Sequence, residues 1–141
     1  MVADARSITP DVFGAWVIKC NPGKTALGPM LSAGAASELW CVADNYRSQM
    51  MAPPQPVLFW VSAHPERGFW GAGRITAVPV RHGDTLRVAT RIPLFDAPLT
   101  AAELKNHPTL AAMEVLRAPQ QSNPSWISAP EWAVLQPLLP L

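Results

Sequence analysis

Apolar residues in this chain come in short runs with the spacing of strands, and turn signals separate the runs. Residues 13–19 form the first run, which ends at an Asn-Pro-Gly turn. Residues 57–62 are continuously apolar, which indicates a central strand covered on both faces. Residues 69–78 follow a Gly-containing turn and are predicted to pair back on this strand as a hairpin.

A later strand is predicted to be half exposed. In residues 86–92, apolar and β-branched positions alternate with Arg87, Ala89 and Arg91, so one face of this strand is basic. In the hairpin, Gly71 and Gly73 weaken a strand unless something must approach it closely at that point.

Helices are predicted to be short, because the chain has 16 prolines, about twice the usual share. Asp44 or Asn45 is expected to cap a helical turn. Capping boxes at residues 100–103 and 128–131 predict two more helix starts. The apolar face of the last helix would consist of Trp132, Leu135 and Leu138.

Two further segments complete the pattern. Residues 24–38 are small and Gly-rich, as in a loop with a short helix, and residues 39–42 form a second short apolar piece. Together the runs predict an α+β chain with a curved or barrel-like β core and short helices around it.

Length and composition indicate one globular domain. Of the 141 residues, 49% are hydrophobic and 15% are charged, well below the usual quarter, which excludes a disordered chain. No apolar stretch has the length of a signal peptide or of a membrane helix, and only two cysteines occur. A cytoplasmic protein that does not enter a membrane is therefore expected, and a monomer is favoured.

The net charge is only +1, but the middle of the chain is basic. Residues 44–91 carry six arginines and three acids. Such a segment indicates either a surface that contacts phosphates or a solvated strand face.

Six tryptophans are the strongest chemical signal in the sequence. An aromatic face can stack on a base, or enclose a methyl group or a cation. Plain core packing is the alternative for each tryptophan, and Trp132 at helical spacing is assigned to the core.

The spacing of possible ligands does not favour a metal or a cofactor. The cysteines and histidines lack the spacing of a zinc site, and no phosphate-binding glycine loop is present. No metal and no cofactor are therefore expected. The scattered residues are Cys20, Cys41, His64, His82 and His107.

Four segments, taken in order, resemble the motifs of the EVE domain, a PUA-like family related to the YTH readers of modified RNA and to ASCH domains. Residues 16–22 resemble the opening strand, and residues 40–47 resemble the Trp-x-x-x-Arg-Asn-Tyr motif. Residues 57–76 resemble the hydrophobic hairpin, and residues 117–124 resemble the closing motif. The sequence departs from the family pattern at Cys20, Asn21, Asp44, Trp60 and Val61.

The resemblance covers about residues 13–137 of a single domain that spans residues 1–141. It implies a PUA-like, partly open β barrel of five to six strands, flanked by short helices. It also implies a pocket between the sheet and a helix that accommodates a flipped base.

Within that pocket, the resemblance makes Trp40 an aromatic wall and Asn45 a matching donor and acceptor for a base edge. The other implied pocket residues are Lys19, Cys20, Asn21, Pro22, Tyr46, Ser62, Trp70, Gln121 and Ser122. The residues expected to contact phosphates are Arg74, Arg87 and Arg91.

The leading hypothesis is a module, not an enzyme, that binds DNA or RNA and holds a modified base in an aromatic pocket. One alternative is a PUA- or ASCH-like enzyme acting on a nucleoside or RNA, with Cys41, Cys20 or Lys19 as its reactive group. Another is a ligand-free interaction module that docks a partner through an exposed Trp126 and the Pro-rich residues 136–141.

Overall fold

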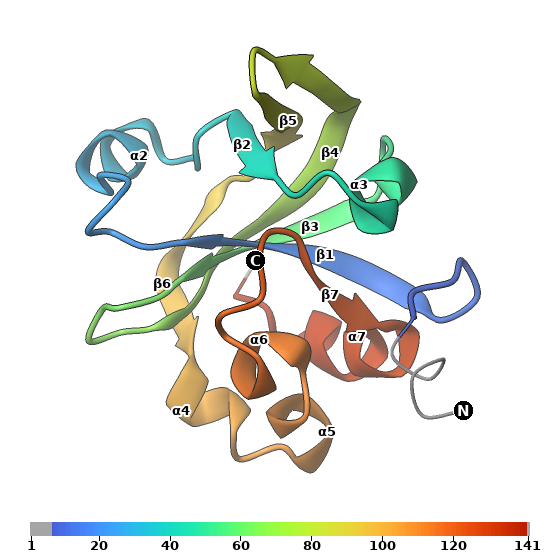
Figure 1. Cartoon of the computed structure of the whole chain (residues 1–141). Coiled ribbons are helices and arrows are strands. Elements are labelled where there is room, and N and C mark those ends of the chain that lie inside the picture. The colour runs from blue at the N-terminus through green and yellow to red at the C-terminus, as the bar shows by residue number, and fades with distance from the viewer. Residues whose placement is uncertain (1–6, 141) are drawn as a thin grey trace.

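The computed structural model of the chain describes residues 7–140, which form one mixed sheet with short helices on either side of it (Figure 1). The seven strands found there are β1 (Phe13–Cys20), β2 (Leu39–Val42), β3 (Pro56–Val61), β4 (Gly68–His82), β5 (Thr85–Arg91), β6 (Leu94–Thr100) and β7 (Ser125–Ser128).

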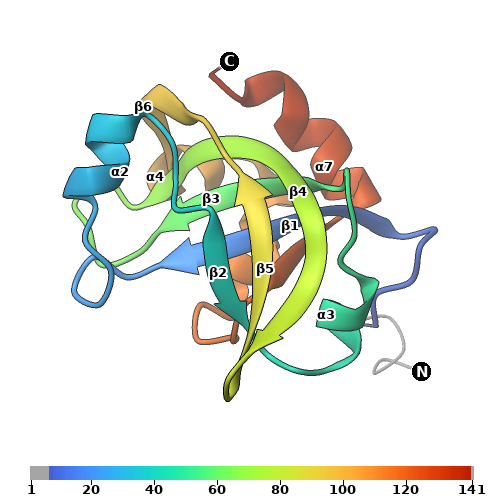
Figure 2. The same ribbon diagram turned by 90° about the horizontal axis from the view of Figure 1, so that it is seen from above.

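The strands follow the order β2-β5-β4-β3-β1-β7, and β6 pairs with β4. β1 runs parallel to β3, whereas the other pairs are antiparallel. Because β2 and β7 stand at opposite ends of this order, the sheet curves like a barrel but is not closed (Figure 2). The chain is therefore α+β with an open, barrel-like sheet, as predicted, and the sheet has seven strands rather than five or six.

The helices divide between the two sides of the sheet. Figure 1 shows α4 to α7 gathered on one side, and α2 and α3 near β2 on the other. None of the helices within residues 7–140 is long and apolar enough to cross a membrane. They are α2 (Gly28–Ala33), α3 (Tyr46–Met50), α4 (Ala101–Leu104), α5 (Pro108–Ala111), α6 (Glu114–Arg117), α7 (Ala129–Leu135) and the 3₁₀ helix η1 (Gln136–Leu138).

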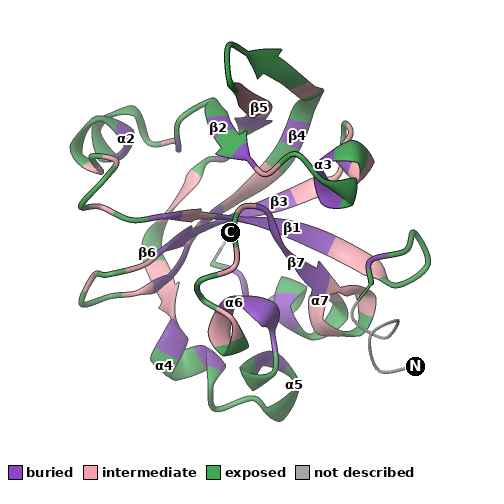
Figure 3. Cartoon of the chain, viewed as in Figure 1, coloured by how far each residue is buried: buried purple, intermediate pink, exposed green. Residues whose placement is uncertain are grey.

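The centre of the sheet is buried on both faces (Figure 3). Ile18 of β1 and Phe59 of β3 belong to the apolar cluster inside the curved sheet. Val17 and Leu58, their neighbours in sequence, belong to the cluster beneath the helices on the other face. All four side chains are completely buried, and each such burial is worth about 1.5–3 kcal/mol. The prediction of a central strand at residues 57–62, covered on both faces, is confirmed.

The predicted helix starts are confirmed by their caps. The Asn45 side chain caps α3. The Thr100 hydroxyl accepts a hydrogen bond from the Glu103 main-chain N–H at 3.3 Å, at the start of α4. The Ser128 hydroxyl accepts the same bond from Glu131 at 3.3 Å, at the start of α7. In each of the last two boxes the glutamate side chain accepts from the main chain of the capping residue, so the pair is reciprocal.

Two strands and the exposure of two side chains differ from expectation. β6 and β7 were not foreseen, because β6 follows Pro93 and contains Pro98, and β7 has only four residues. Trp126 lies in β7 and is only 7% exposed, so the expectation of an exposed Trp126 is wrong. Leu138, expected on the buried face of the last helix, is exposed.

The two hairpin glycines allow the chain after β5 to pass close to β4. A Cβ atom on Gly71 would lie 2.6 Å from the Pro93 carbonyl oxygen. A Cβ atom on Gly73 would lie 2.7 Å from Ile92 Cα and closer still to the Arg91 carbonyl oxygen. The close approach that these glycines suggest is therefore the path of residues 91–94 across β4.

We expect Gly73→Ala to destabilise the fold by about 1–3 kcal/mol, because the added methyl group meets main-chain atoms that cannot rotate away. Gly28→Ala is the matched control, since a Cβ atom there meets nothing within 4 Å. Urea denaturation followed by circular dichroism measures both variants. Equal stability of the two would contradict the close packing at Gly73.

Candidate functional site

A pocket of about 360 Å³ opens beside β2, where the curved sheet is not closed. It lies between the end of β1, the edge strand β2 and the segment that precedes β7. Its volume falls in the range of about 300–1,000 Å³ that is usual for small-molecule sites. We call it the Trp40 pocket, and it is lined by Lys19, Cys20, Asn21, Lys24, Thr25, Ser37, Leu39, Trp40, Cys41 and Asn123.

Asn123 connects the two strands that flank this pocket. Its side-chain oxygen accepts from the Lys19 main-chain N–H at 2.8 Å, and its side-chain nitrogen donates to the Lys19 carbonyl at 3.0 Å. Its own carbonyl accepts from the Ala43 N–H, just beyond β2, at 2.8 Å. The amide thus extends the ladder of β1 at a point where the next residue, Pro124, has no N–H to offer.

A buried ion pair holds this segment from behind. The Arg47 guanidinium makes two hydrogen bonds to the Glu114 carboxylate, at 2.7 and 2.9 Å, and donates to the Pro124 carbonyl at 3.0 Å. Arg47 and Glu114 are 8% and 6% exposed. The hydrogen bonds that Arg47 donates to Glu114 raise the pKa of Arg47 above its ordinary value. The pair therefore joins α3, α6 and the segment before β7.

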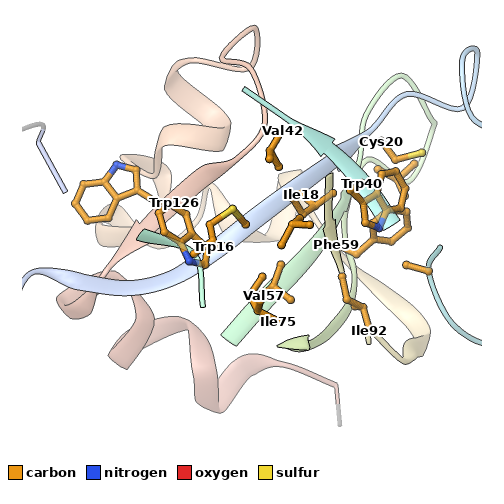
Figure 4. Packing of buried hydrophobic residues seen from close by; sticks show 14 of the residues in the cluster. Trp16, Ile18, Cys20, Trp40, Val42, Val57, Phe59, Ile75, Ile92 and Trp126 are labelled. Carbon is orange, nitrogen blue, oxygen red and sulfur yellow. The ribbon is translucent and has the colours of Figure 1, made fainter. Parts of the chain in front are cut away.

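Trp40 is at once a core residue and a wall of the pocket. Its indole nitrogen donates to the Ser37 carbonyl at 2.8 Å, and its ring centroid lies 5.4 Å from that of Phe59. Figure 4 shows Trp40 between Phe59 and Cys20, at the opposite end of the cluster from Trp16 and Trp126. Because only 7% of Trp40 is exposed, it offers the pocket a narrow strip of its ring.

The edge of β2 brings main-chain polar groups to the pocket. The Glu38 carbonyl accepts from the Thr90 N–H on the β5 side, whereas the Ala43 N–H donates to Asn123 on the opposite side. Main-chain groups alternate along a strand, so those of Leu39 and Cys41 point away from β5, toward the open gap. A ligand in the gap therefore meets both donors and acceptors in fixed positions.

The pocket has a positive electrostatic character. Lys19 donates from its ammonium to the Pro119 carbonyl at 3.2 Å and to the Gln121 carbonyl. Burial lowers the pKa of Lys19 from its ordinary value, and the nearby Glu114 charge opposes this change. Lys24 is exposed at the rim. The lining of this pocket, as far as the chain is described, includes two lysines and no carboxylate.

The two cysteines differ in their chemistry. Cys20 is 2% exposed, and burial raises the pKa of its thiol to about 11. It is therefore almost wholly protonated at neutral pH, which is unfavourable for a nucleophile. Cys41 is exposed and stands on the lining of the pocket.

Three of the other expected pocket residues form hydrogen bonds within the protein instead of facing the pocket. The Ser62 hydroxyl donates to the Cys20 carbonyl at 3.1 Å, and the Gln121 carbonyl accepts from Lys19. The Asn45 side chain is used as the cap of α3, where it accepts from Arg47 N at 3.0 Å. None of the three lines the pocket, and neither do Pro22 and Ser122.

Tyr46 and Trp70 lie elsewhere. The Tyr46 hydroxyl accepts from the Ile8 main-chain N–H at 3.2 Å, on the outer side of α3. Trp70 belongs to a separate hollow beside β6. Of the expected pocket residues, those that the fold brings together on one lining are Lys19, Cys20, Asn21 and Trp40.

Asn123 and the Arg47–Glu114 pair are among the residues that sequence reasoning missed. Asn123 and Arg47 both fall inside motifs that were recognised, but neither was assigned a role. For Asn123, the one local signal is the Asn-Pro dipeptide at 123–124, which indicates a turn. Nothing local predicts that Arg47 meets an acid 67 positions away.

The three arginines expected to contact phosphates share one outer face of the sheet. In the β4–β5 pair, Arg74 stands opposite Arg91. In the β2–β5 pair, Arg87 stands opposite Cys41 on the pocket lining. Residues directly opposite share a face, and so do Arg87 and Arg91, which are four positions apart on β5. We call this surface the arginine face.

The arginine face has no acidic partners in the described part of the chain. The ion pairs found within residues 7–140 are Arg47 with Glu114 and Arg81 with Asp44. Like charges directly opposite each other, as in Arg74 and Arg91, are destabilising. The face is therefore suited to an anion that lies between or across these side chains. Across the same residues, no three His, Cys, Asp or Glu side chains are placed to hold a metal ion.

No family model matches this chain, and no curated protein matches it. Among solved structures, it is similar to a Pseudomonas syringae protein, with 19% identity, a TM-score of 0.68, and coverage of 89% of this chain and 99% of that one. A hypothetical protein from Leishmania major has 19% identity, a TM-score of 0.69, and coverage of 89% and 94%. A Rhodopseudomonas palustris protein has 21% identity, a TM-score of 0.64, and coverage of 86% and 89%. These likenesses show a shared fold.

We expect Asn123→Ala to lower the free energy of unfolding by about 1–3 kcal/mol, because it leaves the Lys19 N–H and C=O without their partners. Asn106→Ala, at an exposed asparagine beyond α4, is the control and should change stability little. Urea denaturation of the two variants tests this. If Asn123→Ala is as stable as Asn106→Ala, Asn123 does not connect the strands as described.

Proposed function

We propose that this chain is a nucleic-acid-binding module of the PUA-like, EVE type, and that it holds one base, in modified form, in the Trp40 pocket. The observation that carries the proposal is the lining itself. Part of an indole ring, an amide, two ammonium groups and the open edge of β2 converge on one cavity that has no carboxylate on its described lining.

Each of these groups has a counterpart on a base. The exposed strip of Trp40 and the side chain of Leu39 offer apolar contact to a ring or to an added methyl group. The main-chain groups of Leu39 and Cys41, which point into the open gap, match donors and acceptors on a base edge. A methyl group alone contributes only about 1–3 kcal/mol of discrimination in an apolar pocket, so the polar contacts must supply the rest of the affinity.

The arginine face supports binding of a strand rather than of a free base. Arg87 stands across from Cys41, so the arginine face begins at the rim of the pocket. Phosphates held there would position the strand without reading its sequence. A base in a duplex would still have to be flipped out, at a cost of a few kcal/mol.

Purified protein titrated with fluorescently labelled oligonucleotides tests the proposal. The strands carry 5-methylcytosine, 5-hydroxymethylcytosine, N6-methyladenine or no modification, and anisotropy is read at low and moderate salt. We expect one modified strand to bind more tightly than its unmodified twin at both salt concentrations. Binding that ignores every modification and disappears with salt would mean backbone contact alone.

Blocking Cys41 locates the base. Cys41 is the exposed thiol and Cys20 is buried with a raised pKa, so a bulky maleimide should react at Cys41. We expect the adduct to remove the preference for the modified strand, because it fills the pocket. Cys41→Ser treated with the same reagent is the control and should keep the preference. An adduct that binds like untreated protein would place the base elsewhere.

Neutralising the arginine face tests the phosphate contacts. Arg87→Gln and Arg91→Gln should each weaken binding to all strands alike and reduce the salt slope by about 0.7–0.9 per lost contact. Lys105→Gln, at an exposed position just after α4 on the helical side, is the control and should change neither quantity. Salt-dependent anisotropy titrations give both values. An unchanged slope in the arginine variants would exclude these side chains as phosphate contacts.

A further inference from the structure

Trp70, expected in the base pocket, instead forms a wall of a second cavity. This cavity has a volume of about 280 Å³ and lies where the turn between β3 and β4 meets β6. Figures 1 and 2 both show that turn beside β6. We call it the Trp70 pocket, and the lining residues that matter here are His64, Glu66, Trp70, Leu94, Phe95 and Asp96.

The aromatic wall of the Trp70 pocket is held in place by the turn itself. The Trp70 indole nitrogen donates to the Glu66 carbonyl at 2.9 Å. The His64 ring meets the Trp70 ring nearly at right angles, at 83°, with centroids 4.7 Å apart. The polar N–H of Trp70 is thus already satisfied, so the part of Trp70 that remains for a ligand is its π surface.

The charges on this cavity are negative. Glu66 and Asp96 are exposed carboxylates, and neither forms an ion pair with any residue between 7 and 140. The His64 Nδ1 accepts a hydrogen bond from the Glu66 main-chain N–H at 2.9 Å, which holds the ring in the turn. No lysine or arginine stands on the described lining of this pocket, in contrast to the Trp40 pocket.

We propose that the Trp70 pocket is a second binding site, which takes an alkylated ammonium group against Trp70 and Phe95 with Glu66 and Asp96 as its counter-charges. Such a cation suits the site on three grounds. Its methyl groups fit an apolar wall that includes Leu94. Its diffuse charge is attracted by the aromatic rings. It also needs no hydrogen-bond acceptor, which matches carboxylates that remain hydrated at the rim.

The site is separate from the Trp40 pocket, since the two pockets share no lining residue. The ligand chemistry has two sources: a small quaternary amine, or a methylated lysine side chain on another protein. Both present the same trimethylammonium group to the pocket.

The test compares choline with 3,3-dimethylbutan-1-ol, its uncharged counterpart of the same shape, on the full chain. Binding is followed by the NMR shift of the Trp70 indole N–H. We expect choline to bind and the neutral compound to bind roughly threefold to tenfold more weakly, because it lacks the attraction of a cation for the rings and carboxylates. Equal binding of the two compounds, or binding of neither, would overturn the proposal.

Variants locate the effect. Glu66→Gln together with Asp96→Asn should abolish the preference for choline, whereas Asp84→Asn, an exposed acid in the β4–β5 turn, should leave it unchanged. Trp70→Leu should remove binding, and thermal denaturation checks that it still folds. Glu66 and Asp96 are exposed, so their substitution should not unfold the protein. The doubly neutralised variant therefore still tests the proposal if Trp70→Leu does not fold. A choline preference that survives in the doubly neutralised protein would contradict it.

The source of the ammonium group is distinguished by a peptide that contains trimethyl-lysine, compared with the free amino acid. Tighter binding of the peptide by about tenfold or more indicates a protein side chain as the natural ligand. Equal binding indicates a small amine. Both results uphold the site.

Discussion

The Arg47–Glu114 ion pair is the interaction on which the shape of the Trp40 pocket depends. It lies out of water, and removing one partner of such a pair typically costs about 3–5 kcal/mol, because the other charge stays buried and unpaired. Its third hydrogen bond goes to the Pro124 carbonyl. Pro124 follows Asn123, whose amide joins the end of β1 and whose carbonyl reaches the chain beyond β2. The open side of the barrel is therefore bridged by hydrogen bonds at one point, and the cavity lies beside that bridge.

The parts of the fold that could be predicted from sequence are those decided locally. The capping boxes that begin at Thr100 and Ser128 involve only residues three positions apart. The continuous apolar run that forms β3 indicates by itself a strand buried on both faces. β7 could not be predicted, because its four residues become a strand by pairing with β1, more than 100 positions earlier. β6 carries Pro98, which argues against a strand until β4 supplies the partner.

The candidate site also combines residues that could be placed from the sequence with residues whose roles depend on the folded structure. The resemblance grouped Lys19, Cys20 and Asn21, which are consecutive at the end of β1, and it placed Trp40 of the edge strand β2 with them. Asn45 was expected to meet a ligand through its amide, but the first turn of α3 uses that amide as a cap. Trp70 was assigned to the base pocket by the resemblance, but it lies at a register shift in β4, between Phe69 opposite Trp60 and Gly71 opposite Phe59, and it lines the other cavity.

The net charge of +1 conceals two surfaces of opposite sign. The lysines of the Trp40 pocket and the arginine face that begins at its rim form one surface, and the carboxylates of the Trp70 pocket form another. A polyanion drawn to the first is repelled by the second, which restricts the orientations in which a strand can approach. An ammonium ligand in the Trp70 pocket would neutralise part of that repulsion. If both sites bind as proposed, the two ligands therefore assist each other through the electrostatic field alone, without any change in the fold.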